Sequence, residues 1–269
     1  MSGFSADWLT LREPVDHASI NHQVRQACVD WCDQREMIEI VDLGCGTGSN
    51  FRSLSPDLTR PQRWTLIDYD AGLLELAELR SVQTIQATSG ASLQVKLGDF
   101  ASGDIAGLIE DCDLVTASAL FDLVSPSVID AMVQQITTVG AAFYTTLTYD
   151  GIASWQPEHT ADQFMRDAFN KHQRTDKGFG PAAGADATNA LATAFDAAGY
   201  RVARGKSAWI LDARYQALRR ETDRGWAAAV REIGDVASDE VDAWHAHRQG
   251  SSDAVSIVGH EDLFAAPKV

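Results

Sequence analysis

A glycine-rich turn directly after a short apolar run is the feature that most constrains how this chain can fold. Residues 37–43 form a β-branched run that stops at Gly44, and residues 41–50 read Val-Asp-Leu-Gly-Cys-Gly-Thr-Gly-Ser-Asn. Glycine adopts positive φ angles and lets another molecule approach the bare backbone. A helix that follows such a turn points its N-terminal N–H groups at that molecule. The segment therefore predicts a buried strand, a tight turn and a helix that together form a ligand-binding corner.

Apolar runs and helical periodicity alternate through the first half of the chain. Further strands are expected at 64–67, 93–97, 113–118 and 141–148, and helices at 16–35, 71–80 and 127–138. Strands separated by helices of roughly 10 to 15 residues favour parallel βαβ units. We therefore expect an α/β fold, with a doubly wound, mostly parallel sheet that carries helices on both faces.

The second half of the chain does not continue this regular alternation of strands and helices. Residues 149–184 are rich in Trp, His, Arg, Lys and Gly, with one helical candidate at 161–171. Insertions at the carboxyl end of a strand commonly form lids or substrate loops. The elements expected after the insertion are helices at 187–198, 215–233 and 240–248 and strands at 200–212 and 254–265. No internal repeat or linker is evident, so residues 1–269 are expected to form a single domain.

The charge balance restricts the partners. Against 38 Asp and Glu, the 22 Lys and Arg leave a net charge of −16 with His neutral. Such a field repels nucleic-acid phosphates and anionic membranes, so neither is expected as a partner. The start of the chain has no basic and apolar leader, and no run approaches the roughly 18 apolar residues that span a bilayer. We expect a soluble, cytoplasmic protein, either a monomer or a homodimer.

The cysteines do not suggest a disulfide framework or a metal site. The four are scattered through the chain, at Cys28, Cys32, Cys45 and Cys112. Cys28 and Cys32 lie four residues apart on an expected helix, but no second pair of Cys or His completes a structural zinc set. We therefore expect no bound metal.

Acidic and aromatic residues at the ends of three of the expected strands suit a nucleoside. Asp68 follows the run 64–67 about 20 residues after the glycine turn, where a carboxylate can accept both hydroxyls of a ribose. Asp99 can accept a hydrogen bond from an exocyclic amine, and Phe100 can pack on a ring face. Asp42 would repel a pyrophosphate but suits a positive charge. Together these residues indicate a nucleoside with a cationic, amino-acid-like tail.

Two other nucleotide-binding classes fit less well. A nicotinamide or flavin turn has Gly-x-Gly-x-x-Gly/Ala, and the last of these positions is Ser49 here. The Gly-x-x-x-x-Gly-Lys-Ser/Thr loop of nucleotide hydrolases is absent. A nicotinamide-dependent reductase remains an alternative that a binding test with NADH can check.

The sequence resembles the class I S-adenosylmethionine (SAM)-dependent methyltransferases over roughly residues 37–148. The resemblance rests on Asp-Leu-Gly-Cys-Gly-Thr-Gly at 42–48, on Asp68 and on Gly-Asp-Phe at 98–100. It implies SAM as cofactor and a seven-stranded sheet of order 3-2-1-4-5-7-6 with the last strand antiparallel. The residues that it implies at the cofactor are Asp42, Gly44, Gly46, Gly48, Asn50, Asp68, Asp99, Phe100 and Ser118. By the same resemblance residues 1–36 form an N-terminal helical cover, with Trp8 and Arg12 over the cofactor.

The acceptor of the methyl group is expected to bind beside the insertion 149–184, which would act as its lid. Methyl transfer to an O, N or C atom needs alignment above all, and a base only when the attacking atom carries a proton. The candidates for acceptor binding are Tyr149, Trp155, Arg174 and Lys177. The candidates for the base are His172 and His159, with Asp122 to orient the acceptor. The basic cluster 171–177 can attract a carboxylate or phosphate, or can simply be a solvated helix end.

A small molecule is the expected acceptor. Methyltransferases of nucleic-acid bases and protein amides often carry Asn/Asp-Pro-Pro-Tyr after the fourth strand, whereas this chain has Ser-Ala-Leu-Phe-Asp at 118–122. The acidic net charge agrees with that departure. The alternatives are an RNA or protein methyltransferase and a SAM-binding regulator without catalytic activity.

Overall fold

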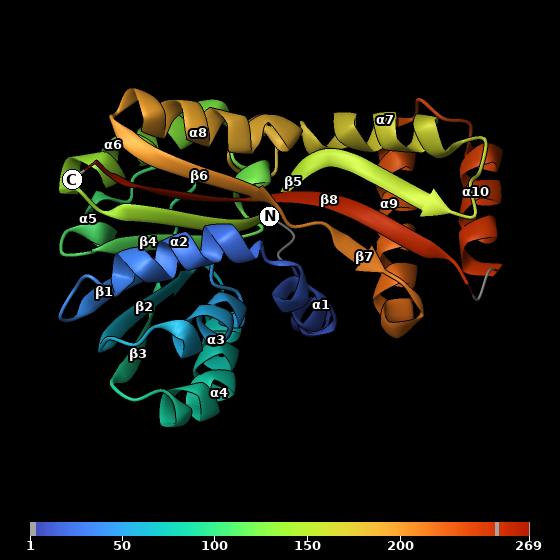
Figure 1. The fold of residues 1–269 in the computed structure, drawn as a ribbon. Helices are drawn as coiled ribbons and strands as arrows, with labels where there is room; N and C mark the ends of the chain where they lie inside the picture. The colour runs from blue at the N-terminus through green and yellow to red at the C-terminus, as the bar shows by residue number, and fades with distance from the viewer. Residues whose placement is uncertain (1–3, 251–252, 269) are drawn as a thin grey trace.

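A mixed β-sheet forms the centre of the computed structural model, which describes residues 4–250 and 253–268. Within those residues the sheet has eight strands in the order β3-β2-β1-β4-β5-β8-β6, and β7 pairs with β8 (Figure 1). The strands are β1 Ile38–Leu43, β2 Gln62–Asp68, β3 Ala91–Leu97, β4 Leu114–Ser118, β5 Ala142–Gln156, β6 Tyr200–Lys206, β7 Trp209–Leu211 and β8 Val255–Pro267. β1 to β5 are parallel, and β8 is antiparallel to its neighbours. The predicted α/β class and strand order are confirmed, with β7 as an addition.

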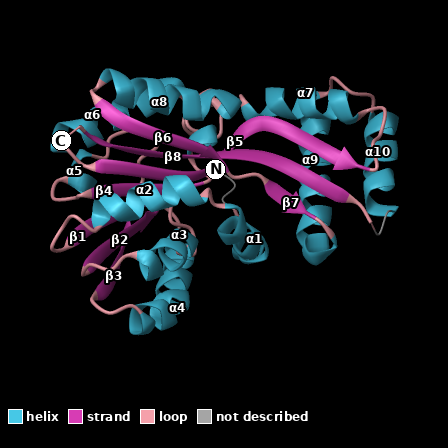
Figure 2. Ribbon diagram, viewed as in Figure 1, coloured by secondary structure: helices cyan, strands magenta, loops and turns pink. Residues whose placement is uncertain are grey.

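Helices pack on both faces of the sheet (Figure 2). Their bounds are α1 Ala6–Ser19, α2 His22–Cys32, α3 Ser49–Leu54, α4 Ala71–Ala87, α5 Ala106–Ile109, α6 Pro126–Val139, α7 Asp162–Gln173, α8 Ala187–Ala197, α9 Gln216–Ile233 and α10 Ser238–Gly250. Successive strand residues point to opposite faces. Ile38 and Ile40 of β1 accordingly pack with α2, α3 and α4, while Val41 and Leu43 pack with α5, α6 and α8. Both faces of β1 are therefore apolar, as expected of a central parallel strand.

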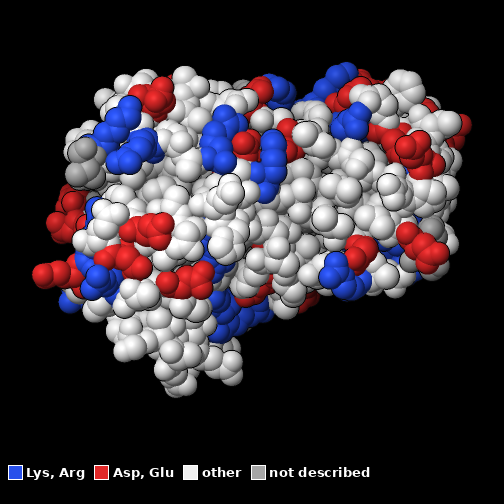
Figure 3. Space-filling model, viewed as in Figure 1, with Lys and Arg blue, Asp and Glu red and all other residues white. Residues whose placement is uncertain are grey.

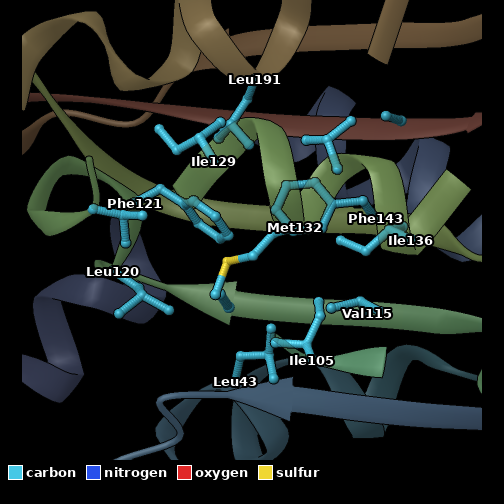
Figure 4. Close-up of a cluster of buried hydrophobic side chains, with 14 of the residues drawn as sticks. Leu43, Ile105, Val115, Leu120, Phe121, Ile129, Met132, Ile136, Phe143 and Leu191 are labelled. Atoms are coloured by element: carbon cyan, nitrogen blue, oxygen red, sulfur yellow. The ribbon is translucent and has the colours of Figure 1, made fainter. Parts of the chain in front are cut away.

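The core between the sheet and α6 is made of interlocking aliphatic and aromatic side chains. Figure 4 shows this cluster, which includes Met132 and Ile129 of α6, Val115 of β4 and Phe143 of β5. The Phe121 and Phe143 rings pack edge to face, with centroids 5.2 Å apart. This core fixes the carboxyl ends of β4 and β5, where the residues that line the site begin.

A second lobe is built on the far ends of β5 and β8, which continue past the other strands (Figure 1). The two strands stay paired from Ala153 opposite Val258 to Gln156 opposite Val255. α7, α9, α10 and β7 cover this extension, and their apolar side chains form a separate buried cluster around three tryptophans, Trp155, Trp226 and Trp244. The expected insertion 149–184 thus begins as a strand and contributes α7 to this lobe.

Two expected elements are each divided in the structure. The single helix expected at 16–35 is two helices, because Asn21 caps α2 by accepting hydrogen bonds from the N–H groups of Gln23 and Val24. The single strand expected at 200–212 is split into β6 and β7. Ser207 lies at this break, and its hydroxyl donates a hydrogen bond to buried Asp262.

Charged side chains of both signs are interspersed over the face of the molecule in Figure 3. That face therefore lacks the continuous basic surface by which proteins bind nucleic acids. Within residues 4–250 and 253–268, no helix has the length and apolar character needed to cross a bilayer.

Candidate functional site

A cavity of about 1340 Å³ lies at the carboxyl ends of β1, β2 and β4 and beside the middle of β5, at Leu147 and Tyr149. Ligands of open α/β sheets bind at this edge, because every parallel strand delivers its following loop there. The glycine turn, Asp68, Ser118 and Tyr149 line the strand side of the cavity. Residues of α1, α7, α9, β7 and β8 line the rest, so the cavity extends from the glycine turn to the second lobe.

The glycine turn after β1 has the backbone geometry that its sequence predicts. Gly44, Gly46 and Gly48 have φ angles of 65°, 54° and 80°. The Asp68 carboxylate accepts hydrogen bonds from the N–H groups of Gly46 at 2.9 Å and Asp70 at 3.0 Å. Asp68 thus ties the turn to the end of β2, and burial raises the pKa of its carboxyl.

The Asp42 carboxylate lies in β1, two residues before Gly44, and only one of its two oxygens has hydrogen-bond partners among the described residues. Its Oδ1 accepts hydrogen bonds from Asn50 Nδ2 and Thr116 Oγ1, both at 2.7 Å. Its Oδ2 is buried without a hydrogen-bond partner among the described residues. Burial raises the pKa of Asp42 to about 6, against the opposing effect of those two hydrogen bonds. A buried acceptor atom beside a cavity suits a ligand group that is positively charged.

The far end of the cavity is aromatic. The rings that line it are those of Trp8, Tyr149, Phe169, Trp209 and Trp226. Phe169 and Trp226 stack with centroids 3.8 Å apart, and Tyr149 meets both rings at their edges. This end of the cavity therefore offers flat apolar surface, on which a ligand's apolar or aromatic part can pack.

A buried ion pair joins α1 to this aromatic end. Arg12 donates hydrogen bonds to both oxygens of Asp16, at 2.7 and 3.2 Å, and its guanidinium lies 4.9 Å from the centroid of the Trp209 ring. Trp209 Nε1 also donates to Asp16, at 2.9 Å. The ring of His260 lies 5.0 Å from that of Trp209. Burial, with the positive charge of Arg12, lowers the pKa of His260 to about 3, so this imidazole is neutral at physiological pH.

Asp122 follows β4 and is 7% exposed. Burial raises the pKa of its carboxyl to about 6, while a backbone hydrogen bond at Asp122, the charge of Arg12 and a backbone hydrogen bond at Tyr149 oppose the rise. Two other residues of the lining, Ala119 and Leu147, have positive φ angles of 51° and 58°, which non-glycine residues rarely adopt. Such strained positions commonly lie at binding and catalytic sites.

Most of the residues suggested by the sequence meet at this cavity. Those that line it are Asp42, Gly44, Gly46, Asn50, Asp68, Phe100, Ser118, Asp122, Tyr149, His172 and Lys177. Trp8 and Arg12 of the expected N-terminal cover line it as well. Within it, His172 Nε2 lies 2.9 Å from Glu232 and Lys177 Nζ lies 3.2 Å from His172 Nδ1.

Five of the suggested residues lie outside the lining of this cavity. Gly48 faces Arg52 and Ser81, and Asp99 is exposed and accepts a hydrogen bond from the Ala101 N–H. Trp155 is buried against Trp226 and Trp244, because β5 continues as a strand and turns this side chain into the second lobe. His159 accepts a hydrogen bond from the Ala161 N–H and packs on His247. Arg174 is exposed and pairs with Asp186 at 2.6 Å.

The C-terminal third of the chain also lines the cavity, which the sequence did not predict. Trp209, Trp226 and His260 line the cavity from β7, α9 and β8. The available signal was the polar triplet His-Glu-Asp at 260–262 inside an otherwise apolar strand. A polar residue at a buried strand position commonly has a hydrogen-bonding or functional reason.

Comparison with known proteins agrees with this geometry. Residues 40–141, which run from β1 through α6, match the methyltransferase domain family. No curated protein matches the chain. The structure is similar to that of the YcgJ protein from Bacillus subtilis, with 12% identity, a TM-score of 0.53, and 93% of this chain and 100% of that chain covered.

Two structures of SAM-dependent methyltransferases in complex with S-adenosylhomocysteine are also similar. The one from Geobacter sulfurreducens has 15% identity and a TM-score of 0.48, and each chain is covered to 100%. The one from Thiobacillus denitrificans has 16% identity and a TM-score of 0.47, with 98% of this chain and 99% of that chain covered.

Proposed function

We propose that the protein, whose residues 40–141 match the methyltransferase domain family, transfers a methyl group from SAM to a small-molecule acceptor. The observation that carries the proposal is the single cavity of about 1340 Å³ that joins the glycine turn to the aromatic end. Ligand pockets commonly measure about 300 to 1,000 Å³. This cavity therefore has room for a nucleoside cofactor and a second small molecule together.

The residues at the glycine turn fit SAM. The turn gives close approach to bare backbone, which a Cβ at Gly46 would obstruct by lying 3.0 Å from Leu9. The unpartnered Oδ2 of Asp42 suits the ammonium of the methionine moiety, and Asp68 suits the ribose hydroxyls. Phe100 offers a buried ring for the adenine. When bound, SAM supplies a methyl group on a positively charged sulfur, which is an electrophile without further activation.

The protein's own part in the reaction is to align the acceptor and exclude water. α1 covers the glycine turn through Leu9 and lines the cavity through Trp8 and Arg12. α7 and the loop after it close the opposite side with Phe169, His172 and Lys177. Alignment of two bound reactants supplies most of the acceleration in a displacement of this kind. In this proposal 1–36, of which residues 1–3 lie outside the described part of the chain, is the N-terminal cover, and 149–184 supplies the acceptor lid.

Incubation with SAM labelled in its methyl group tests the proposal. The enzyme is given three separate fractions of a cell extract, namely small molecules, protein and RNA. We expect label in the small-molecule fraction and none above background in the other two. Label in protein or RNA would favour a macromolecular acceptor instead, and tight SAM binding without transfer to any fraction would favour a non-catalytic regulator.

Asp68→Ala is expected to weaken SAM binding. The change removes hydrogen bonds to a charged carboxylate, worth about 1.5 to 3 kcal/mol each, which corresponds to roughly 10- to 100-fold in Kd. It also releases the Gly46 N–H that Asp68 holds. Calorimetric titration with SAM measures the loss. Asp70→Ala is the matched control, since Asp70 caps α4 and does not line the cavity. Equal Kd values for Asp68→Ala and the wild type would remove Asp68 from the cofactor site.

Arg174→Ala is expected to leave the acceptor KM unchanged, because this side chain is exposed and paired with Asp186. Lys177→Ala, only three residues along the chain, is expected to alter that KM, because Lys177 lines the cavity. Initial-rate kinetics at saturating SAM compare the two variants. An Arg174→Ala enzyme with the larger change in KM would show that the loop closes differently around the acceptor.

A further inference from the structure

The charges around the aromatic end point to the chemical class of the acceptor. Seven Asp and Glu side chains line the cavity, against two Lys and Arg side chains. Asp42 and Asp68 belong to the glycine-turn end, and three others are paired, Asp16 with Arg12, Glu221 with Arg224 and Glu232 with His172. Asp122 and Asp176 are left without an ion pair among the described residues. Those two cations are already engaged, Arg12 by Asp16 and Lys177 by His172. A ligand that carries an anion would have to displace these partners. A ligand that carries a cation meets an excess of negative charge.

Asp122 is one of the carboxylates that line the cavity. Its carboxyl is buried, and Arg12, the cation that acts on it, is held by two hydrogen bonds to Asp16. Asp122 also lies near Tyr149, because its charge adds to the effects of burial and of Asp150 in raising the pKa of that phenol. Backbone hydrogen bonds at Asp122 and Tyr149 act on this carboxyl, but no Lys, Arg or His side chain of the described residues forms an ion pair with it. A buried carboxylate without a cationic partner suits a ligand that carries the positive charge.

The aromatic rings at this end of the cavity also favour a cationic ligand. The faces of Trp and Tyr attract cations within about 6 Å of the ring centroid. Trp209 already accommodates the Arg12 guanidinium at 4.9 Å. His260 lies beside Trp209 and Tyr149, and burial keeps it neutral, so it adds no opposing positive charge. Phe169 and Trp226 provide the apolar surface beyond these groups.

Resting on the methyltransferase function proposed above, we propose that the acceptor is an amine, protonated in solution, whose nitrogen binds at Asp122 and whose apolar or aromatic body packs on the neighbouring rings. The ammonium first loses one proton, to Asp122 or to water through it. The nitrogen lone pair then forms the N–C bond while the bond between methyl carbon and sulfur breaks, with its electron pair left on sulfur. The sulfonium charge disappears, and the positive charge is carried by the methylated nitrogen.

A matched set of three ligands tests this proposal. Phenethylamine, 2-phenylethanol and 3-phenylpropionate carry similar bodies with a cation, a neutral group and an anion. Each is titrated by calorimetry at pH 7.5 into the protein saturated with S-adenosylhomocysteine, and each is assayed as an acceptor with labelled SAM. We expect the amine to bind at least about tenfold more tightly than the other two, which is about 1.4 kcal/mol, and to be the acceptor that takes up label.

Two Asp→Asn variants separate a local effect from one of net charge. Asp122→Asn is expected to lose the preference for the amine while its Kd for S-adenosylhomocysteine stays the same. Asp111→Asn, which removes an exposed carboxylate outside the cavity lining, is expected to retain the preference. A thermal melt checks that both variants fold.

The results distinguish this proposal from the function on which it rests. Binding of S-adenosylhomocysteine together with equal or weaker binding of the amine, no detectable amine binding, or a preference retained in Asp122→Asn, would overturn the amine proposal alone. Failure of S-adenosylhomocysteine to bind would overturn the methyltransferase function, and the three ligands would then be compared without it.

Discussion

Replacing Gly46 by valine is expected to abolish SAM binding while leaving the protein folded. Gly46 has a φ of +54°, a conformation that a β-branched residue adopts only under strain, and its Cβ would lie 3.0 Å from Leu9 of α1. The new side chain would also fill the approach to the backbone of the turn. We expect the Kd for SAM to rise by at least about 100-fold, or about 2.7 kcal/mol, measured by calorimetry.

Gly107→Val is the matched control for this change. Gly107 lies in α5 outside the cavity lining, and a Cβ there meets no atom within 4 Å. This variant is expected to bind SAM as the wild type does. Retained SAM binding in Gly46→Val, with a normal thermal melt, would mean that the turn binds something else.

Asp122→Asn is expected to make the protein without ligands more stable at pH 7.5. The folded pKa of Asp122 is raised from 3.8 to about 6, so the folded state binds more protons than the unfolded state between those values. Stability contributed by the protonated carboxyl is complete below about pH 4 and is lost as the pH rises through about 6. An asparagine does not titrate and avoids the burial of a charge.

The expected gain at pH 7.5 follows from the size of the shift. About two pKa units at about 1.4 kcal/mol each give up to about 3 kcal/mol in the free energy of unfolding. Thermal and urea unfolding at pH 4 and pH 7.5 measure it, with Asp111→Asn as the exposed control. The advantage of Asp122→Asn over the wild type should be present at pH 7.5 and absent at pH 4. If Asp122→Asn were more stable than the wild type by the same amount at pH 4 and at pH 7.5, the ionised carboxylate would not be what destabilises the folded state.

The cofactor side of the candidate site could be predicted, because its residues lie next to one another or directly after strands in the sequence. The turn at 44–48, Asp42 and Asp68 all lie at the ends of strands whose apolar runs are continuous in the sequence. Parallel strands bring those ends to one edge of the sheet, so the cofactor side follows from topology. Asp99 was the exception, because the turn after β3 directs its carboxylate to the Ala101 N–H rather than to the cavity.

The acceptor side could not be predicted in the same way, because it depends on contacts between distant segments. Trp209 and Asp16, which share a hydrogen bond, are 193 residues apart in the sequence. Trp155 and Arg174 were suggested by residue type alone. One belongs to the packed interior of the second lobe and the other to an exposed ion pair. No local pattern distinguishes those positions from that of Tyr149, which does line the cavity.

Calorimetric titration of the purified protein with SAM and with S-adenosylhomocysteine, beside NADH as the control, tests whether the glycine turn binds SAM. We expect both sulfur ligands to bind at one site per chain with micromolar Kd, Asp68→Ala to weaken both, and NADH not to bind. If neither sulfur ligand bound the folded protein, or if NADH bound in their place, the assignment of the glycine turn to SAM would be contradicted.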